Sequence, residues 1–157
     1  YAHGKQEKRN FHKGFTLIEI LVVIFILGIL LTLTVASLAN SRAKTRDIIR
    51  VSDVRQLQSA LELYFYNKDA FPVAANIVLG SNDYDVFCDT VAGFQGAEEG
   101  CSAIYFKKLP LAPIPPADNS YIYNSADGKT YTITFTLEKE TGTLSAGQRT
   151  ATPDGMQ

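Results

Sequence analysis

Histidine is almost absent from this chain, and its scarcity excludes several classes of enzyme. The two histidines, His3 and His12, both precede Phe15. Beyond Phe15 the chain therefore lacks a Ser-His-Asp triad, a Cys-His pair and a His-ligated zinc site. Its two cysteines cannot close a four-ligand zinc site by themselves, and no glycine-rich phosphate loop follows a predicted strand. We therefore predict a protein that is not an enzyme and that holds no metal or cofactor.

Basic residues are scarce in the second half of the chain. From Lys68 onward there are 6 basic and 11 acidic residues, whereas a nucleic-acid-binding protein presents a dense positive face to the phosphates. These counts argue against nucleic acid as a partner without excluding it. Five carboxylates crowd one segment, residues 83–99: Asp83, Asp85, Asp89, Glu98 and Glu99. An acid–base pair or a calcium site is an alternative there, but the spacing differs from a known calcium loop, and we interpret the segment as a solvated acidic loop.

Charge is missing from residues 15–39, where Glu19 is the one ionisable side chain among 25 residues. As a helix this run is about 37 Å long, enough to cross a hydrocarbon core of about 30 Å. A cleavable secretory signal has a shorter apolar core of about 7 to 15 residues. We therefore predict a transmembrane helix. Four basic residues flank it on each side, so the positive-inside rule leaves its orientation undecided.

Glycine and proline are missing from residues 42–67. Apolar residues recur there at spacings of three or four, which predicts an amphipathic helix. The stripe comprises Ile48, Val51, Val54, Leu57, Leu61, Tyr64 and Phe65. Pro72 forces the residue before it out of helical geometry. We therefore expect a single helix over residues 15–67, with a first half that is apolar all round and a second half that packs on a small domain.

The C-terminal part of the chain carries the signal of an antiparallel sheet. Residues 131–138 alternate apolar and polar side chains, and Asp127-Gly128 is a hairpin turn between this run and residues 121–123. Residues 144–146 are a candidate third strand, and the Pro- and Gly-containing residues 73–118 read mainly as loop. The apolar face of the sheet needs a cover, and the helical stripe supplies it. The fold class we predict is α+β, a long N-terminal helix packed on a small C-terminal antiparallel sheet.

The two cysteines, Cys88 and Cys101, close a loop of 14 residues. In an exported protein an even number of cysteines predicts a disulfide. A disulfide that closes a loop of about 15 residues stabilises the folded protein by roughly 3 kcal/mol. The apolar run argues for export. The alternative is two buried free thiols.

Arg42, Arg46 and Arg50 lie four residues apart and share one helix face. They are able to bind phosphates of nucleic acid or lipid. We interpret them as a basic collar at the level of the lipid headgroups. In an assembly they would instead meet the acidic domain of a neighbouring subunit.

The sequence Gly14-Phe15-Thr16-Leu17-Ile18-Glu19 and the apolar run after it resemble the start of type IV prepilins and of type II secretion pseudopilins. The resemblance covers residues 13–40 closely and implies a type IV pilin-like fold. It also implies that a membrane peptidase cuts after Gly14 and methylates Phe15. Residues 1–14 are then a cytoplasmic leader, 15–40 the membrane and assembly half of the helix, and 41–157 the rest of the helix with an outward-facing sheet domain.

The resemblance implies a partner for Glu19, because cleavage after Gly14 creates an ammonium group at Phe15. A buried charge left without its partner costs about 3 to 5 kcal/mol. We predict that Glu19 pairs with the Phe15 amine of a neighbouring subunit and sets the register of helix stacking. The alternative is a carboxylate solvated by headgroups near the membrane edge. Many family members carry a helix-bending proline where this chain has Ala36, so bending there is less well supported.

The function we predict is that of a structural subunit of a type IV pilus-like filament. It starts as a single-pass precursor in the inner membrane and ends in an extracellular or periplasmic filament. The expected partners are further copies of the chain, the prepilin peptidase and a pilus or secretion assembly platform. Alternatives are a type II secretion pseudopilin, a membrane-anchored ligand-binding module and a tethered hydrolase that uses the acidic loop.

Overall fold

The computed structural model describes residues 14–116 and 119–157. The predicted leader, apart from Gly14, lies outside these residues, as do both histidines. The chain divides into two compact units, Tyr1–Ala39 and Asn40–Gln157. Helix α1 (Leu17–Lys68) contributes to both units and agrees with the predicted helix to within two residues at each end. The units are described separately below.

In the first unit, α1 begins with a capping box formed by Thr16 and Glu19. The Glu19 N–H donates to Thr16 Oγ1 at 3.3 Å, and the Thr16 N–H donates to Glu19 Oε2 at 3.4 Å. This reciprocal pair satisfies N–H groups that have no partner in the helix, so it fixes where α1 starts. Further along, the hydroxyls of Thr32 and Thr34 donate to the carbonyls of Ile29 and Leu30, which removes the cost of unpaired hydroxyls in an apolar helix.

By length and composition, α1 is able to cross a membrane, and it is the one such helix among the described residues. Its large apolar side chains in the first unit, from Leu17 to Leu38, are exposed, and none of them belongs to the buried core of the described residues. A helix that is apolar all round is stable only inside lipid or among other apolar helices. Ala36, the position at which a helix bend was in question, belongs to α1, and its side chain lies outside the described residues.

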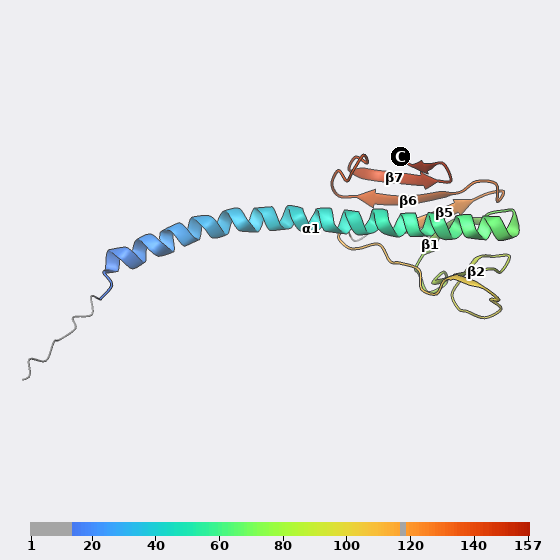
Figure 1. Ribbon diagram of the computed structural model, residues 1–157, viewed down its shortest axis with the longest axis horizontal. Coiled ribbons are helices and arrows are strands. Elements are labelled where there is room, and N and C mark those ends of the chain that lie inside the picture. Colours follow the sequence, from blue (N-terminus) through green and yellow to red (C-terminus); the bar gives the residue numbers. More distant parts are fainter. Residues whose placement is uncertain (1–13, 117–118) are drawn as a thin grey trace, which may run out of the picture. The chain divides into compact units, whose positions relative to one another are not determined.

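The second unit contains a five-stranded antiparallel sheet in the order β1-β5-β6-β7-β8 and a three-stranded sheet in the order β3-β2-β4. Figure 1 shows β5, β6 and β7 lying along the second half of α1. The strands of the two sheets have these bounds: β1 (Ala74–Leu79), β2 (Val86–Cys88), β3 (Phe94–Gln95), β4 (Ile104–Phe106), β5 (Tyr121–Ser125), β6 (Thr132–Leu137), β7 (Gly147–Thr152) and β8 (Gly155–Met156).

The predicted packing of the sheet on the helix is confirmed. In β6, Ile133, Phe135 and Leu137 are buried and alternate with partly exposed threonines. They join one core with Leu57 and Leu61 of the helical stripe, both fully buried. Burial of one large aliphatic side chain contributes about 1.5 to 3 kcal/mol. This contact between helix and sheet is therefore the main source of stability in the second unit.

Several predicted details were wrong or incomplete. Residues 73–118 are mainly loop, as predicted, but they also contain β1 and the three short strands of the small sheet, none of which was predicted. Residues 144–146 form no strand: Leu144 closes a turn through a bridge to Thr141, and the strand that follows β6 in the chain and pairs with it is β7. In the helical stripe, Ile48 is 53% exposed and Phe65 is 36% exposed, because each lies at an end of the stripe.

Candidate assembly site

Gly14, Phe15 and Glu19, the predicted processing and assembly residues, lie together at the start of α1. Phe15 is 78% exposed and precedes the helix, and Gly14 is exposed as well. The capping box holds the Glu19 carboxylate over the first turn, near the chain atoms of Thr16. The helix dipole favours a negative charge at this end. The local sequence thus positions one acid four residues from the predicted cleavage point, where it is open to a partner.

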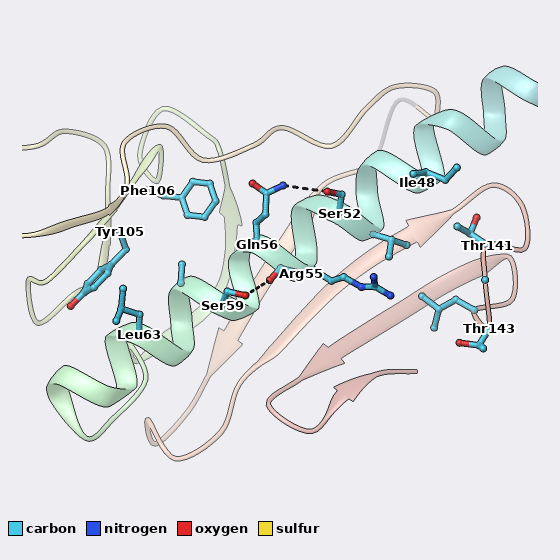
Figure 2. Close-up of a pocket in the computed structure, with 14 residues that line it drawn as sticks. Ile48, Ser52, Arg55, Gln56, Ser59, Leu63, Tyr105, Phe106, Thr141 and Thr143 are labelled. Carbon is cyan, nitrogen blue, oxygen red and sulfur yellow. Dashed lines mark hydrogen bonds between the residues drawn. The ribbon is translucent and has the colours of Figure 1, made fainter.

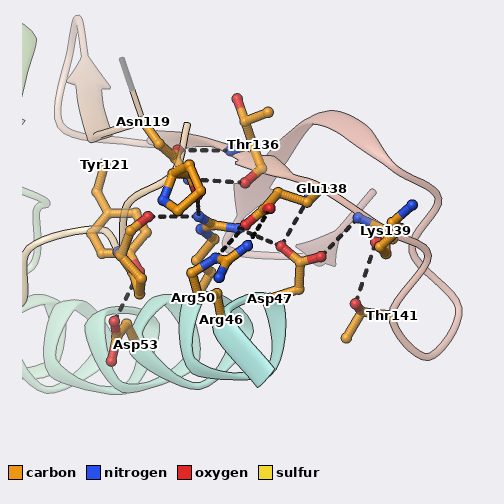
Figure 3. Close-up of polar contacts among 12 residues, drawn as sticks. Arg46, Asp47, Arg50, Asp53, Asn119, Tyr121, Thr136, Glu138, Lys139 and Thr141 are labelled. Atoms are coloured by element: carbon orange, nitrogen blue, oxygen red, sulfur yellow. Dashed lines mark hydrogen bonds and ion pairs between the residues drawn. The ribbon is translucent and has the colours of Figure 1, made fainter. Parts of the chain in front are cut away.

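A network of charged side chains ties the second unit together where α1 meets the end of β6 (Figure 3). Arg46 makes a bidentate contact with Glu138, with Nε to Oε1 at 2.7 Å and Nη2 to Oε2 at 2.6 Å. Arg50 Nη1 donates to Asp47 Oδ1 at 2.5 Å and to Glu138 Oε1 at 2.8 Å. Two guanidinium groups therefore hold one carboxylate, and they lower the pKa of Glu138 to about 2.

Arg50 also connects the proline-rich segment to the helix. Its Nη2 donates to the carbonyl oxygens of Pro113 and Pro115, each at 2.5 Å, and its side chain is fully buried. Asp47 completes the network by accepting the backbone N–H groups of Glu138 and Lys139, at 3.0 and 2.7 Å. One fully buried ion pair thus joins the helix, the sheet and the proline-rich segment.

The predicted basic collar is therefore wrong for Arg46 and Arg50, which bind carboxylates of their own chain. Arg42 alone of the three is exposed. Sequence reasoning placed all three on a polar face because four-residue spacing is a local signal. Glu138 lies 88 to 92 residues away in sequence, and nothing near it marks it as their partner.

A second polar contact between helix and sheet lies beside this network. The Tyr121 hydroxyl donates to Asp53 Oδ2 at 2.8 Å, as Figure 3 shows. Burial raises the pKa of Asp53, and the hydrogen bond from Tyr121 opposes this effect in part. Tyr121 is fully buried, and its hydroxyl is one of the groups that align the helix on the sheet.

The predicted disulfide is present between Cys88 and Cys101, with 5.7 Å between the Cα atoms. It closes a loop, and Asp89 near its start accepts the backbone N–H groups of Ser102 and Ala103, just past its end, at 2.8 and 2.9 Å. These hydrogen bonds lower the pKa of Asp89. Its carboxylate therefore orders the loop backbone.

The acidic loop does not gather into a metal site. Among the residues that the structure describes, no group of three or more His, Cys, Asp or Glu side chains is placed to hold a metal ion. Glu98 instead approaches the Lys107 ammonium at 3.3 Å in an exposed ion pair.

Two comparisons identify the class of protein to which this fold and this N-terminus belong. Residues 9–35 match the family model of the prokaryotic N-terminal methylation motif, a range that includes Gly14, Phe15 and Glu19. An N-terminal apolar helix that continues onto an antiparallel sheet, together with this motif, defines a type IV pilin-like protein.

Within that class, the chain belongs to the family of type II secretion system core protein G. It is 35% identical over 131 residues to the Vibrio cholerae protein of that name, and the match covers 83% of each chain. The Pseudomonas aeruginosa protein is 35% identical over 106 residues, 68% of this chain and 70% of that protein. The Pectobacterium carotovorum protein is 43% identical over 71 residues, 45% of this chain and 44% of its own length.

The chain thus spans less than half the length of several relatives that it matches. No solved structure gives a significant match.

Proposed function

We propose that this protein is a pseudopilin, a structural subunit of the helical filament of a type II secretion system. The single observation that carries this proposal is the similarity to type II secretion system core protein G along most of the chain. It favours the secretion alternative over the broader expectation of a type IV pilus-like filament. The mechanism that follows is assembly rather than catalysis.

Processing after Gly14 supplies the charge that assembly needs. The cut exposes an ammonium group on Phe15 four residues before Glu19, in a helix with no other ionisable side chain up to Ala39. In apolar surroundings an ion pair attracts strongly, and an unpaired buried charge costs about 3 to 5 kcal/mol. A subunit is therefore stable among apolar helices only where a neighbour completes the pair, which sets the stacking register.

Storage in the membrane precedes assembly. The exposed apolar side chains of the first unit contact lipid in the inner membrane and contact other helices in the filament. Lipid tails and apolar side chains are similar surroundings, so the transfer involves little net hydrophobic change. The prepilin peptidase and a secretion assembly platform are the partners required. The second unit faces the periplasm, an oxidising compartment in which the Cys88–Cys101 disulfide forms and persists.

Mass spectrometry of the mature N-terminus tests the class directly. We expect the chain in membrane fractions and in sheared filaments to start at a methylated Phe15. A chain that keeps residues 1–14 in its working form would have no ammonium group at Phe15 to pair with Glu19. An uncut monomer of that kind would contradict this function and support a membrane-anchored ligand-binding module.

The Glu19→Gln variant separates the charge of Glu19 from its role in the capping box. Glutamine also forms a capping box, so the start of α1 is kept while the charge is lost. We expect normal cleavage after Gly14 and at least a tenfold loss of filaments, measured by shearing and immunoblotting. Thr16→Ala is the matched control, because it removes a cap of about 1 kcal/mol and keeps the charge. Filaments at the wild-type level from Glu19→Gln would overturn the pairing.

A further inference from the structure

The second unit carries an open groove of about 760 Å³ along α1, between the small sheet and the turn at residues 141–144. One helix face forms its floor, running from Ile48 through Arg55 to Leu63. Figure 2 shows Tyr105 and Phe106 on one side of this floor and Thr141 and Thr143 on the other. We refer to this surface as the helix groove.

The helix groove is apolar and uncovered. Ile48 is 53% exposed and Leu63 is 52% exposed. The polar side chains of Ser52, Gln56 and Ser59 are satisfied within the helix, because Gln56 Nε2 donates to Ser52 Oγ at 3.3 Å and Ser59 Oγ donates to the Arg55 carbonyl at 3.1 Å. An exposed apolar surface with a polar rim marks a site of protein contact rather than of solvation.

Arg55 is the one charged side chain that lines the groove. It is exposed, and within residues 14–116 and 119–157 its guanidinium makes no hydrogen bond or ion pair. Arginine is enriched at the centre of protein interfaces, where surrounding apolar contacts exclude water from it. The occupant should therefore combine an apolar surface with a carboxylate.

The charge of the second unit is divided between its two parts. The exposed charged residues of 40–67, the helical part, are three basic (Arg42, Lys44 and Arg55) and one acidic (Glu62), whereas five basic and seven acidic residues are exposed among the described residues of 68–157. Two copies that met through the same face would bring like charges together. A head-to-tail contact instead brings the basic helix of one copy to the acidic body of the next. Contacts of this heterologous type produce helical filaments when they do not close into a ring.

We propose that the helix groove is the docking site for a second copy of this chain, with Arg55 paired to a carboxylate from residues 68–157 of that copy. This inference rests on the proposed function, because the filament supplies the neighbouring copy. Arg55 then takes the role that the sequence suggested for Arg46 and Arg50, that of a cation that meets an acidic neighbour. Arg46 and Arg50 are not available for it, because they bind Glu138 of their own chain.

Charge reversal tests the role of Arg55 in the full-length chain. We expect Arg55→Glu to reduce sheared filaments at least tenfold while the level of processed subunit in the membrane stays within twofold of wild type. Lys44→Glu is the matched control, since Lys44 is exposed on the same helix, undergoes the same change of charge and does not line the groove. Its filament yield should stay within twofold of wild type. No loss with Arg55→Glu, or an equal loss with both variants, would overturn the proposal.

Photo-crosslinking identifies the occupant. A benzophenone amino acid placed at Gln56, in the centre of the helix groove, should yield a dimer of this chain in filament-producing cells. The second peptide of the crosslink, identified by mass spectrometry, should come from residues 68–157. A peptide from residues 40–67, a different protein, or no crosslink in cells that form filaments would refute the docking. Each of these results would contradict the docking proposal but not the proposed function. The proposed function would be contradicted separately, if the wild-type chain formed no filaments.

Discussion

Arg50 shows, at the scale of single residues, how a buried charge is tolerated in this protein. A buried ion carries a desolvation cost of several kcal/mol, which is offset only when its geometry and hydrogen bonds are good. Arg50 has two carboxylates and two carbonyl oxygens as partners, although its Nε finds none among the described residues. Such a network adds little net stability over an apolar core, but loss of any one member is costly.

Glu138 provides a pH test of this network. Its pKa is lowered from 4.5 to about 2, chiefly by the hydrogen bonds from Arg46. A lowered pKa means that the charged form contributes stability above about pH 4.5, and that this contribution is lost as the pH falls from 4.5 towards 2. We expect Glu138→Gln to lower the free energy of unfolding at pH 7 by about 2 kcal/mol and to weaken its dependence on pH in that window.

Chemical denaturation of the solubilised chain between pH 7 and pH 2 makes this measurement. Glu140→Gln is the control, because Glu140 is exposed and lies two residues away. A pH dependence in Glu138→Gln equal to that of the wild type would show that the network does not bind Glu138 as a charged group.

At the scale of elements, the second unit combines a well-supported sheet with a weakly supported one. The main sheet packs β5 and β6 on the helical stripe, whereas the strands of the small sheet have only two or three residues each. Aromatic contacts support the small sheet, with ring centroids 4.5 Å apart for Phe87 and Phe94 and 5.4 Å apart for Tyr64 and Phe87. The disulfide adds a covalent link between Cys88, at the end of β2, and Cys101.

Replacing both cysteines with serine should therefore destabilise the small sheet most. A loop of this length predicts a loss of roughly 3 kcal/mol in the free energy of unfolding. We expect the rate of amide hydrogen exchange to increase more in β2 and β4 than in β5 and β6. Mass spectrometry on peptides measures these rates. A uniform increase across both sheets would mean that the disulfide stabilises the whole unit as one cooperative block.

Sequence reasoning found some of these elements and missed others for physical reasons. It found β6 because Tyr131 to Leu137 alternate strictly, and it found α1 because the stripe repeats over many turns. It missed β1, where Asn76 has a positive φ of 53° and the pairing register shifts between Ala74 and Ile77. A bulge of this kind interrupts the period of two on which strand prediction depends.

At the scale of the whole molecule, the two units differ in what stabilises them. Every residue of the buried core belongs to the second unit, from Val54 to Ala151. The described part of the first unit presents exposed apolar side chains and requires lipid or neighbouring helices. The second unit therefore has a core of its own, whereas the first unit depends on surroundings that cover its apolar side chains.

Residues 40–157 alone should consequently fold as a soluble monomer. Truncation at this point removes no core residue, and it leaves Asn40 and Ser41, residue types that cap helix N-termini well, at the new start of the helix. Size-exclusion chromatography should give a monomer, and near-ultraviolet circular dichroism should show ordered aromatic side chains. An aggregated or unordered fragment would show that the second unit depends on the first for its fold.

The sequence by itself determined the features that depend on neighbouring residues. These are the N-terminal motif with its capping box from Gly14 to Glu19, the apolar span, the helical stripe and the alternation in β6, all of which repeat or act within a few residues. Only the tertiary structure decided which carboxylate Arg46 and Arg50 bind and where the helix groove opens. Those features join residues as many as 92 positions apart, and contacts over such distances leave no periodic trace in the sequence because they depend on how the helix and sheets pack.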